Sequence, residues 1–191
     1  MTNPFATKAG SFIWGLLLTA CVMTFSACND DDDDNSVVTP TTLNTTDKNI
    51  IDQAAYANRS EIEMGQLALT KSTDSVIRNF AQMMITHHTS AQASLDSVAG
   101  KYSYSLPTGL DSTSQKMKDS LTAITVDSVF SREYILGQRD AHAQVRSKLE
   151  AYQNGTGQNN DVKAYVSKTL PVVINHETEA DTIISQRGYV Q

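Results

Sequence analysis

One stretch, residues 80–98, constrains the fold of this chain more than any other. At 100° per residue, apolar side chains of this stretch and Ile77, which precedes it, fall on a single helical stripe. These side chains are Ile77, Phe80, Met84, Ala91, Leu95 and Val98. His88 lies about 50° to one side of the stripe's centre and His87 about 50° to the other. The pattern predicts an amphipathic helix that carries two adjacent histidines across its buried face.

The chain from residue 47 onward predicts helices only, because prolines are few and no segment sustains an apolar–polar alternation. The expected helices cover residues 47–71, 72–100, 111–123, 127–154 and 161–188. Each long helix has about 25 residues and measures roughly 37 Å. The connection over residues 101–125 can return along that length, whereas an up-down-up-down bundle needs only a short loop. We therefore expect an all-α, ferritin-like four-helix bundle with a long crossover that carries a short extra helix.

Pro171 lies inside the last expected helix. It cannot donate a hydrogen bond to the carbonyl of Ser167, and its ring clashes with that carbonyl. The sequence therefore predicts a kink or a restart between Leu170 and Val172.

Each long helix also carries one candidate metal ligand near its middle. At 1.5 Å per residue these four side chains lie within about 8 Å of one another along the bundle axis. They are Glu61, His88, His142 and His176, with His87 and Glu177 as further candidates. Imidazoles with one carboxylate suit Zn, Cu or Fe. The sequence therefore predicts a transition-metal site at mid-height.

Other interpretations of these residues stay open. Buried histidines also serve as packing and hydrogen-bonding groups, without any metal. A ferritin-type di-iron oxidase is disfavoured, because such sites use two Glu-x-x-His pairs and the sequence has none. Enzymatic catalysis in general has little support, since neither a nucleophile–histidine arrangement nor a glycine-rich phosphate loop is visible.

The N-terminal region has the pattern of an export signal. An apolar run over residues 12–25 is short for a membrane span and ends in small residues before Cys28. It resembles a bacterial lipoprotein signal, in which that cysteine is acylated after cleavage; Cys21 is a second match. Because both cysteines lie here, the mature domain has no disulfide. We expect a signal peptide over 1–27, a tether over 28–46 and the bundle over 47–188.

Charge bears on the partners of the mature chain. Five consecutive aspartates, Asp30–Asp34, repel one another and favour a solvated tether. They also resemble the surface-export signals of some Gram-negative lineages. Without the leader and these aspartates, the remaining domain has a formal net charge of −2 and no basic stripe. Nucleic acid is therefore not an expected partner.

Three blocks carry a resemblance to a known family: AYANRSEIEMGQLAL (residues 55–69), FAQMMITHHTSAQASL (80–95) and KTLPVVINHETEA (168–180). They resemble a secreted bacterial ferritin-like family known as domain of unknown function four-one-four-two, often labelled an outer membrane protein. The resemblance implies a ferritin-like bundle and marks Glu61, His88, His142 and His176 as family-pattern positions. It implies no established reaction.

These observations lead to two functional hypotheses. In the first, the chain is an envelope lipoprotein whose bundle binds a transition metal for storage, buffering or resistance. In the second, the bundle is a non-catalytic module that binds an envelope protein partner or supports stress tolerance. Both place it on the outer membrane of a Gram-negative bacterium, held by its lipid and facing the periplasm or the cell surface.

Overall fold

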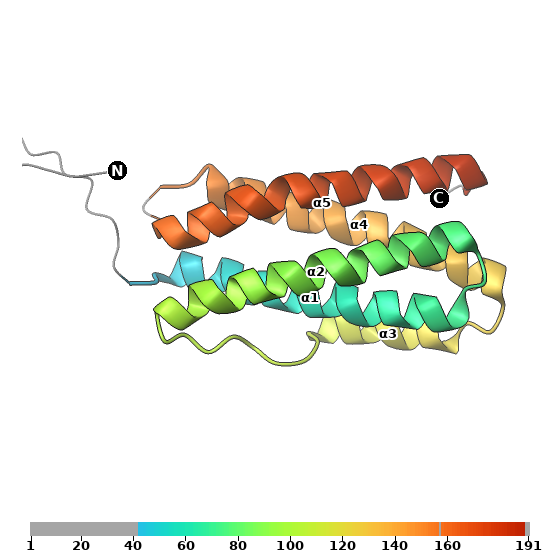
Figure 1. Cartoon of the computed structure of the whole chain (residues 1–191), viewed down its shortest axis with the longest axis horizontal. Coiled ribbons are helices and arrows are strands. Elements are labelled where there is room, and N and C mark those ends of the chain that lie inside the picture. Colours follow the sequence, from blue (N-terminus) through green and yellow to red (C-terminus); the bar gives the residue numbers. More distant parts are fainter. Residues whose placement is uncertain (1–41, 157, 190–191) are drawn as a thin grey trace, which may run out of the picture. The chain divides into compact units, whose positions relative to one another are not determined.

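The computed structural model describes residues 42–156 and 158–189, and every regular element within them is a helix (Figure 1). The signal peptide, both candidate lipidation sites (Cys28 and Cys21) and the tether up to residue 41 lie outside the described residues. The five helices are α1 (Thr45–Lys71), α2 (Ser75–Lys101), α3 (Ser112–Ala123), α4 (Asp127–Gln153) and α5 (Asn160–Arg187). The prediction of an all-α bundle is confirmed.

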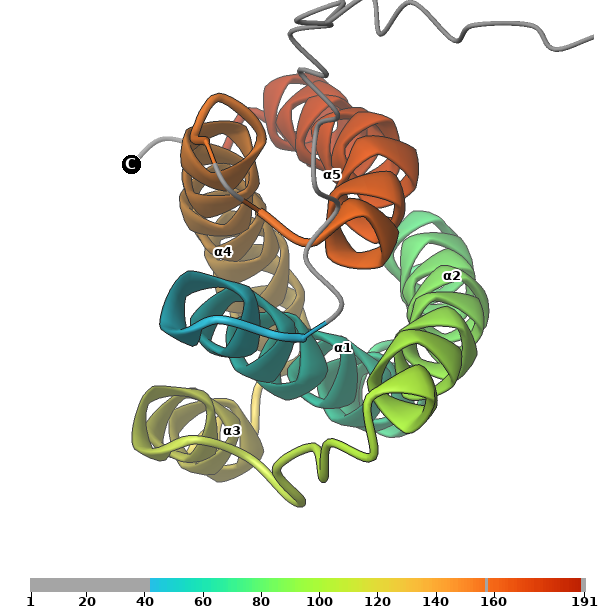
Figure 2. The ribbon, with the colours of Figure 1, turned by 90° about the vertical axis from the view of Figure 1, so that its left-hand side faces the viewer.

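The four long helices form two hairpins, α1–α2 and α4–α5, each closed by a short turn. The segment between α2 and α4 carries α3, which lies on the outside against α1 and α4 (Figure 2). The second hairpin therefore starts at the end of the bundle where α1 finishes (Figure 1). This is the crossover topology predicted from the length of the connection.

α1 starts two residues before the expected residue 47, where Asp47, a good capping residue, would have been the N-cap. Asn44 is the N-cap: its side chain accepts from the Asp47 amide at 2.9 Å, and Asp47 accepts in return from the Asn44 amide at 2.9 Å. Asp47 is fully buried, and its Oδ1 is satisfied there because it accepts from the Tyr152 hydroxyl at 2.6 Å and from the Asn159 amide at 3.0 Å. The bundle thus begins before residue 47, and Leu43 already packs in its core.

The apolar core consists of two clusters. One cluster contains Phe80, Phe130, Tyr134 and Ile183. The other contains Ile51, Leu95, Leu149 and Val166. On every long helix, the candidate ligand lies between the residues that supply the two clusters. A polar layer therefore crosses the bundle at mid-height, with apolar packing on both sides.

The predicted restart of the last helix at Pro171 is wrong. α5 is one continuous helix from Asn160 to Arg187. Pro171 is exposed, whereas Val166 and Val173 on either side of it are buried in the core. A proline inside a helix costs about 3 kcal/mol of stability. Burial of one apolar side chain contributes about 1.5–3 kcal/mol, so several buried neighbours offset that cost.

Gly65 lies at a tight contact between α1 and α2. A Cβ atom at this position would lie 2.8 Å from Ile85 Cγ1 and 2.9 Å from the backbone oxygen of Ala81. We expect Gly65→Ala to lower the free energy of unfolding by about 1–3 kcal/mol, the usual cost of overpacking. Gly100→Ala is the control, because an added Cβ there meets nothing within 4 Å. Urea denaturation of both variants tests this; equal stability of the two would contradict it.

No helix among residues 42–156 and 158–189 is long and apolar enough to cross a membrane.

Candidate metal centre

The polar layer at mid-height of the bundle brings together three of the six predicted site residues. His88 of α2, His142 of α4 and His176 of α5 each offer one ring nitrogen, and these nitrogens lie within 4.8 Å of one another. All three side chains are buried, with 6%, 2% and 1% of their surface exposed. We call these residues the histidine triad. Such a group could hold a metal ion.

The spacing within the histidine triad is near that of a tetrahedral site. Ligand nitrogens about 2.0–2.1 Å from a tetrahedral metal are roughly 3.3 Å apart. The Nε2 atom of His142 and the Nδ1 atom of His176 are 3.2 Å apart. The third nitrogen, from His88, has to move by at most about 1.5 Å to complete such a geometry.

Each triad histidine has a partner for the ring nitrogen that does not face the others. His88 Nδ1 lies 3.0 Å from Asn58 Oδ1, and His142 Nδ1 lies 2.8 Å from the backbone oxygen of Gln138. His176 Nε2 lies 2.8 Å from His87 Nδ1. An amide or backbone oxygen only accepts, so Nδ1 donates in both His88 and His142. In the neutral form of these two rings, Nε2 therefore keeps its lone pair, as a metal ligand requires.

Burial keeps two of the triad rings neutral. It lowers the pKa of His88 well below its usual range, and nearby positive charge on His142, His176 and His87 would lower it further. Burial, followed by the charges of His142 and His87, lowers the pKa of His176 to about 3. At neutral pH both rings thus have a lone pair free of a proton. His88 Nε2 is buried without a hydrogen-bond partner.

Glu61 lies beside the histidine triad but outside its 4.8 Å group. It lines a cavity of about 20 Å³ together with Asn58, His88 and His142. A cavity of that volume is large enough for one water molecule or ion. Glu61 Oε2, like His88 Nε2, is buried and has no partner. Burial raises the pKa of Glu61, while the charge of His142 acts against that rise.

The two reserve candidates lie outside the triad. His87 is exposed, and its ring stacks on that of His176 with centroids 5.1 Å apart; it supports a triad residue from outside. Glu177 faces Arg146, whose Nε and Nη2 atoms donate to its carboxylate at 2.7 and 3.2 Å. This bidentate ion pair holds the Glu177 carboxylate on Arg146.

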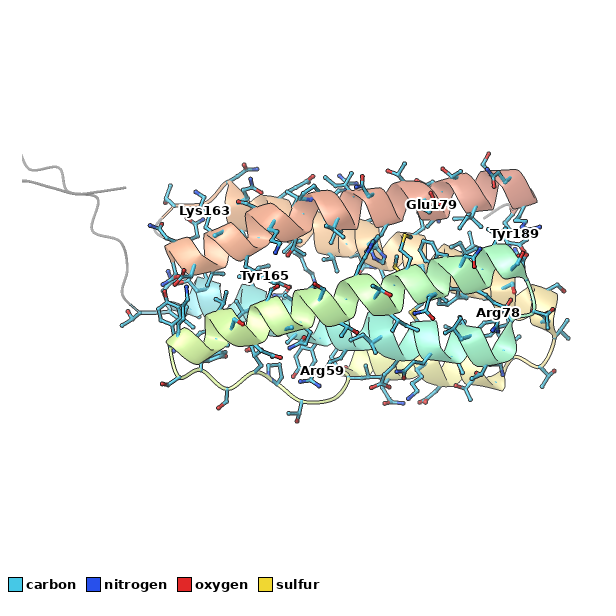
Figure 3. The ribbon with its side chains drawn as sticks, viewed as in Figure 1. Arg59, Arg78, Lys163, Tyr165, Glu179 and Tyr189 are labelled. Carbon is cyan, nitrogen blue, oxygen red and sulfur yellow. The ribbon has the colours of Figure 1, made fainter. Side chains whose placement is uncertain are left out.

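Sequence reasoning missed the residues that orient the triad. Asn58 precedes Glu61 by three positions, and Gln138 precedes His142 by four, so both occupy inner faces at the level of the ligands. Asn58 is fixed in turn by Tyr165, whose hydroxyl accepts from Asn58 Nδ2 at 3.3 Å (Tyr165 is labelled in Figure 3). For Asn58, the available signal was a polar amide on an inner face, one turn before Glu61. Gln138 acts through its backbone oxygen, which any residue supplies, so its identity gave no signal.

Comparison with known families identifies the chain. The family described as "Domain of unknown function (DUF4142)" matches residues 34–183. The chain belongs to the DUF4142 family. The match spans the whole bundle up to Ile183, including the histidine triad, and confirms the resemblance in the sequence blocks. Searches of curated proteins and of solved structures gave no match.

Proposed function

We propose that this DUF4142 protein binds one divalent transition-metal ion in the histidine triad and serves in metal buffering or resistance in the bacterial envelope. The supporting observation is the arrangement of the three imidazoles. On each ring, one nitrogen is engaged by a neighbour outside the triad and the other faces the shared centre, where His88 Nε2 has no partner and His142 Nε2 and His176 Nδ1 share one hydrogen bond that a bound ion would replace. Metal-binding histidines in proteins are oriented in this way by hydrogen bonds to their second ring nitrogen.

The donor set favours Zn²⁺, Cu²⁺ or Fe²⁺. Imidazole nitrogen suits these borderline ions, and no thiolate is available in the described part of the chain. Hard ions such as Mg²⁺ and Ca²⁺ prefer several oxygen ligands, and the Glu61 carboxyl is the one carboxylate that lines the small cavity beside the triad. Three imidazole ligands leave at least one coordination position open, which the small cavity beside Glu61 can accommodate. One centre per chain suits buffering better than bulk storage.

Packing-only histidines are the competing interpretation, and they explain less. A purely structural cluster would be expected to satisfy its buried polar atoms within the protein. Instead Glu61 Oε2 and His88 Nε2 both lack a partner, and both residues line one cavity. An ion or its bound water would supply the missing interaction.

Calorimetry on protein without a histidine tag tests the proposal. Titration of the folded protein with Zn²⁺ or Cu²⁺ at neutral pH should give saturable binding of one ion per chain. The metal should also raise the melting temperature, since it binds the folded state in preference. A flat titration, with folding verified by circular dichroism, would rule the metal hypothesis out. It would leave the hypothesis of a partner-binding module standing.

The envelope location is the second part of the proposal, and it rests on the sequence before the bundle. We propose that Cys28 is the lipid-bearing residue. Cys28→Ala should then abolish labelling by a fatty-acid probe and move the protein from the membrane to the soluble fraction. Labelling that persists in Cys28→Ala and is lost in Cys21→Ala would transfer the anchor to Cys21.

A further inference from the structure

We propose that metal ions reach the histidine triad through the groove between α1 and α4, with the Glu61 carboxyl as the last contact before the histidines. This inference rests on the proposed metal-binding function. It adds a second, transient binding position and an access route to the buried centre. A route is needed because all three triad side chains are at most 6% exposed.

The groove between α1 and α4 measures about 340 Å³. It exists because small side chains, among them Ala57, Ser60 and Ala141, face one another across the two helices. The start of α3 forms its rim with Asp111 and Ser114. The end-on view shows α3 beside α1 and α4, the two helices that form the groove (Figure 2).

Glu61 connects the groove to the centre. It lines both the groove and the cavity of about 20 Å³ that contains His88 and His142. Ala54, Ala57, Val145 and Leu149 also line both spaces, so the two are adjacent. Only 5% of Glu61 is exposed, and its Oε2 atom has no partner. A carboxyl oxygen without a partner, placed at this junction, can bind a cation before the cation reaches the nitrogen ligands.

A second groove, between α2 and α5, also reaches the histidine triad. It measures about 170 Å³ and is lined by His87, His88 and His176. It contains Lys168 and no acidic residue. The groove between α1 and α4 contains Asp111, Asp140 and Glu61 against a single lysine, Lys148.

Charge therefore decides between the two routes. A cleft lined mainly by negative charge concentrates cations, whereas one with a lone positive charge disfavours them. Asp111 also caps α3, with its Oδ1 accepting from the Ser114 amide, and Asp140 is paired with Arg139 at 2.8 Å. Asp140 nonetheless stays exposed at the groove. The acidic groove between α1 and α4 is thus the one that suits a hydrated cation.

Stopped-flow loading with Co²⁺, followed by its visible absorption, tests the route. Gln144 is exposed and lines the groove between α1 and α4, and Ser90 is exposed and lines the other groove. We expect Gln144→Trp to slow both loading and chelator-induced release severalfold and by the same factor. Equilibrium affinity should then stay the same, because an obstacle on a route changes both rates alike. Ser90→Trp is the matched control and should load as fast as wild type.

A charge reversal tests the electrostatic part. Asp140→Lys should slow Co²⁺ loading by about tenfold at low ionic strength, and the difference should shrink in high salt. Slower loading in Ser90→Trp with normal loading in Gln144→Trp would overturn the proposal in favour of the groove between α2 and α5. Normal loading in both would overturn it as well. Failure of wild type to bind any metal at equilibrium is a separate result, and it would instead contradict the proposed function.

Discussion

Zn²⁺ should no longer stabilise the protein once His142 is replaced by Gln. In wild type, free metal about a hundredfold above the dissociation constant should add about 2.7 kcal/mol to the free energy of unfolding. For a domain of this size that is a rise in melting temperature of roughly 5–10 °C. His142 Nε2 is 3.2 Å from His176 Nδ1, the closest pair of nitrogens in the triad. Its loss leaves two imidazoles, too few to hold the ion firmly.

The comparison must be made on the metal-induced shift and not on baseline stability. His142 is 2% exposed, and its Nδ1 donates to the Gln138 backbone oxygen. Removing it should therefore destabilise the metal-free protein by about 1–3 kcal/mol, whether or not a metal binds. Differential scanning fluorimetry with and without Zn²⁺ separates the two effects. A full shift in His142→Gln would exclude the triad as the binding site.

Two further variants define the boundary of the site. His87→Gln removes the residue that contacts His176 Nε2 from outside. Loss of such an outer partner should weaken metal affinity about 10–100-fold without abolishing binding. Glu177→Gln breaks an ion pair with Arg146 and should leave the metal shift unchanged. A full loss of the shift in Glu177→Gln would bring that carboxylate back among the ligands.

The helices of this chain could be predicted because local signals agree with the tertiary structure. Four residues of the predicted stripe, among them Phe80 and Leu95, are buried, and Ala91 and Val98 are half-buried. The helices begin at capping residues such as Asp74, Asp111 and Asn159. The error at the start of α1 arose because Asn44 and Asp47 are both good caps. Which of the two residues caps the helix depends on the hydrogen bonds that Asp47 accepts from Tyr152 and the Asn159 amide, and both are distant in sequence.

The candidate site could be predicted in part for a similar reason. The position of a residue along its helix determines where it lies along the bundle axis. Glu61 and the histidine triad are therefore expected at one level of that axis. Side-chain direction depends on packing between helices, which periodicity does not resolve. His87 and His88 were placed symmetrically about the stripe's centre, yet His88 is buried and His87 exposed. The pairing of Glu177 with Arg146 likewise depends on how α5 is rotated against α4.

Acid should destabilise the metal-free protein steeply between pH 6.5 and pH 5. His88 and His176 have native-state pKa values well below the unfolded value of about 6.5, with His176 at about 3. Below pH 6.5 the unfolded chain therefore binds protons that the native state does not. The contribution of the two histidines to the free energy of unfolding is fully present above the unfolded-state pKa, and it is lost as the pH falls toward the native-state pKa. Each histidine contributes about 1.4 kcal/mol per pH unit, so the two together contribute about 2.7.

Glu61 acts in the opposite direction over part of this range. Burial raises its native pKa, so the native state holds a proton that the unfolded chain has already lost. Its contribution is present at low pH and is lost as pH rises through the native pKa. Where this overlaps the histidine window, the net slope should fall by about 1.4 kcal/mol per pH unit. The two-histidine slope is about half its full value at pH 6.5, where the unfolded histidines are half protonated, and it approaches the full value about one pH unit lower, reduced wherever Glu61 titrates.

Urea denaturation of metal-free protein at closely spaced pH values measures these slopes. His88→Gln and His176→Gln should each lower the slope by about one proton, or 1.4 kcal/mol per pH unit. Glu61→Gln should steepen it at the acid end of the range, since the opposing group is gone. Saturating Zn²⁺ should steepen the loss further, because protonated imidazole cannot bind metal. A slope that is the same in wild type and both histidine variants would mean that these rings are protonated in the native state.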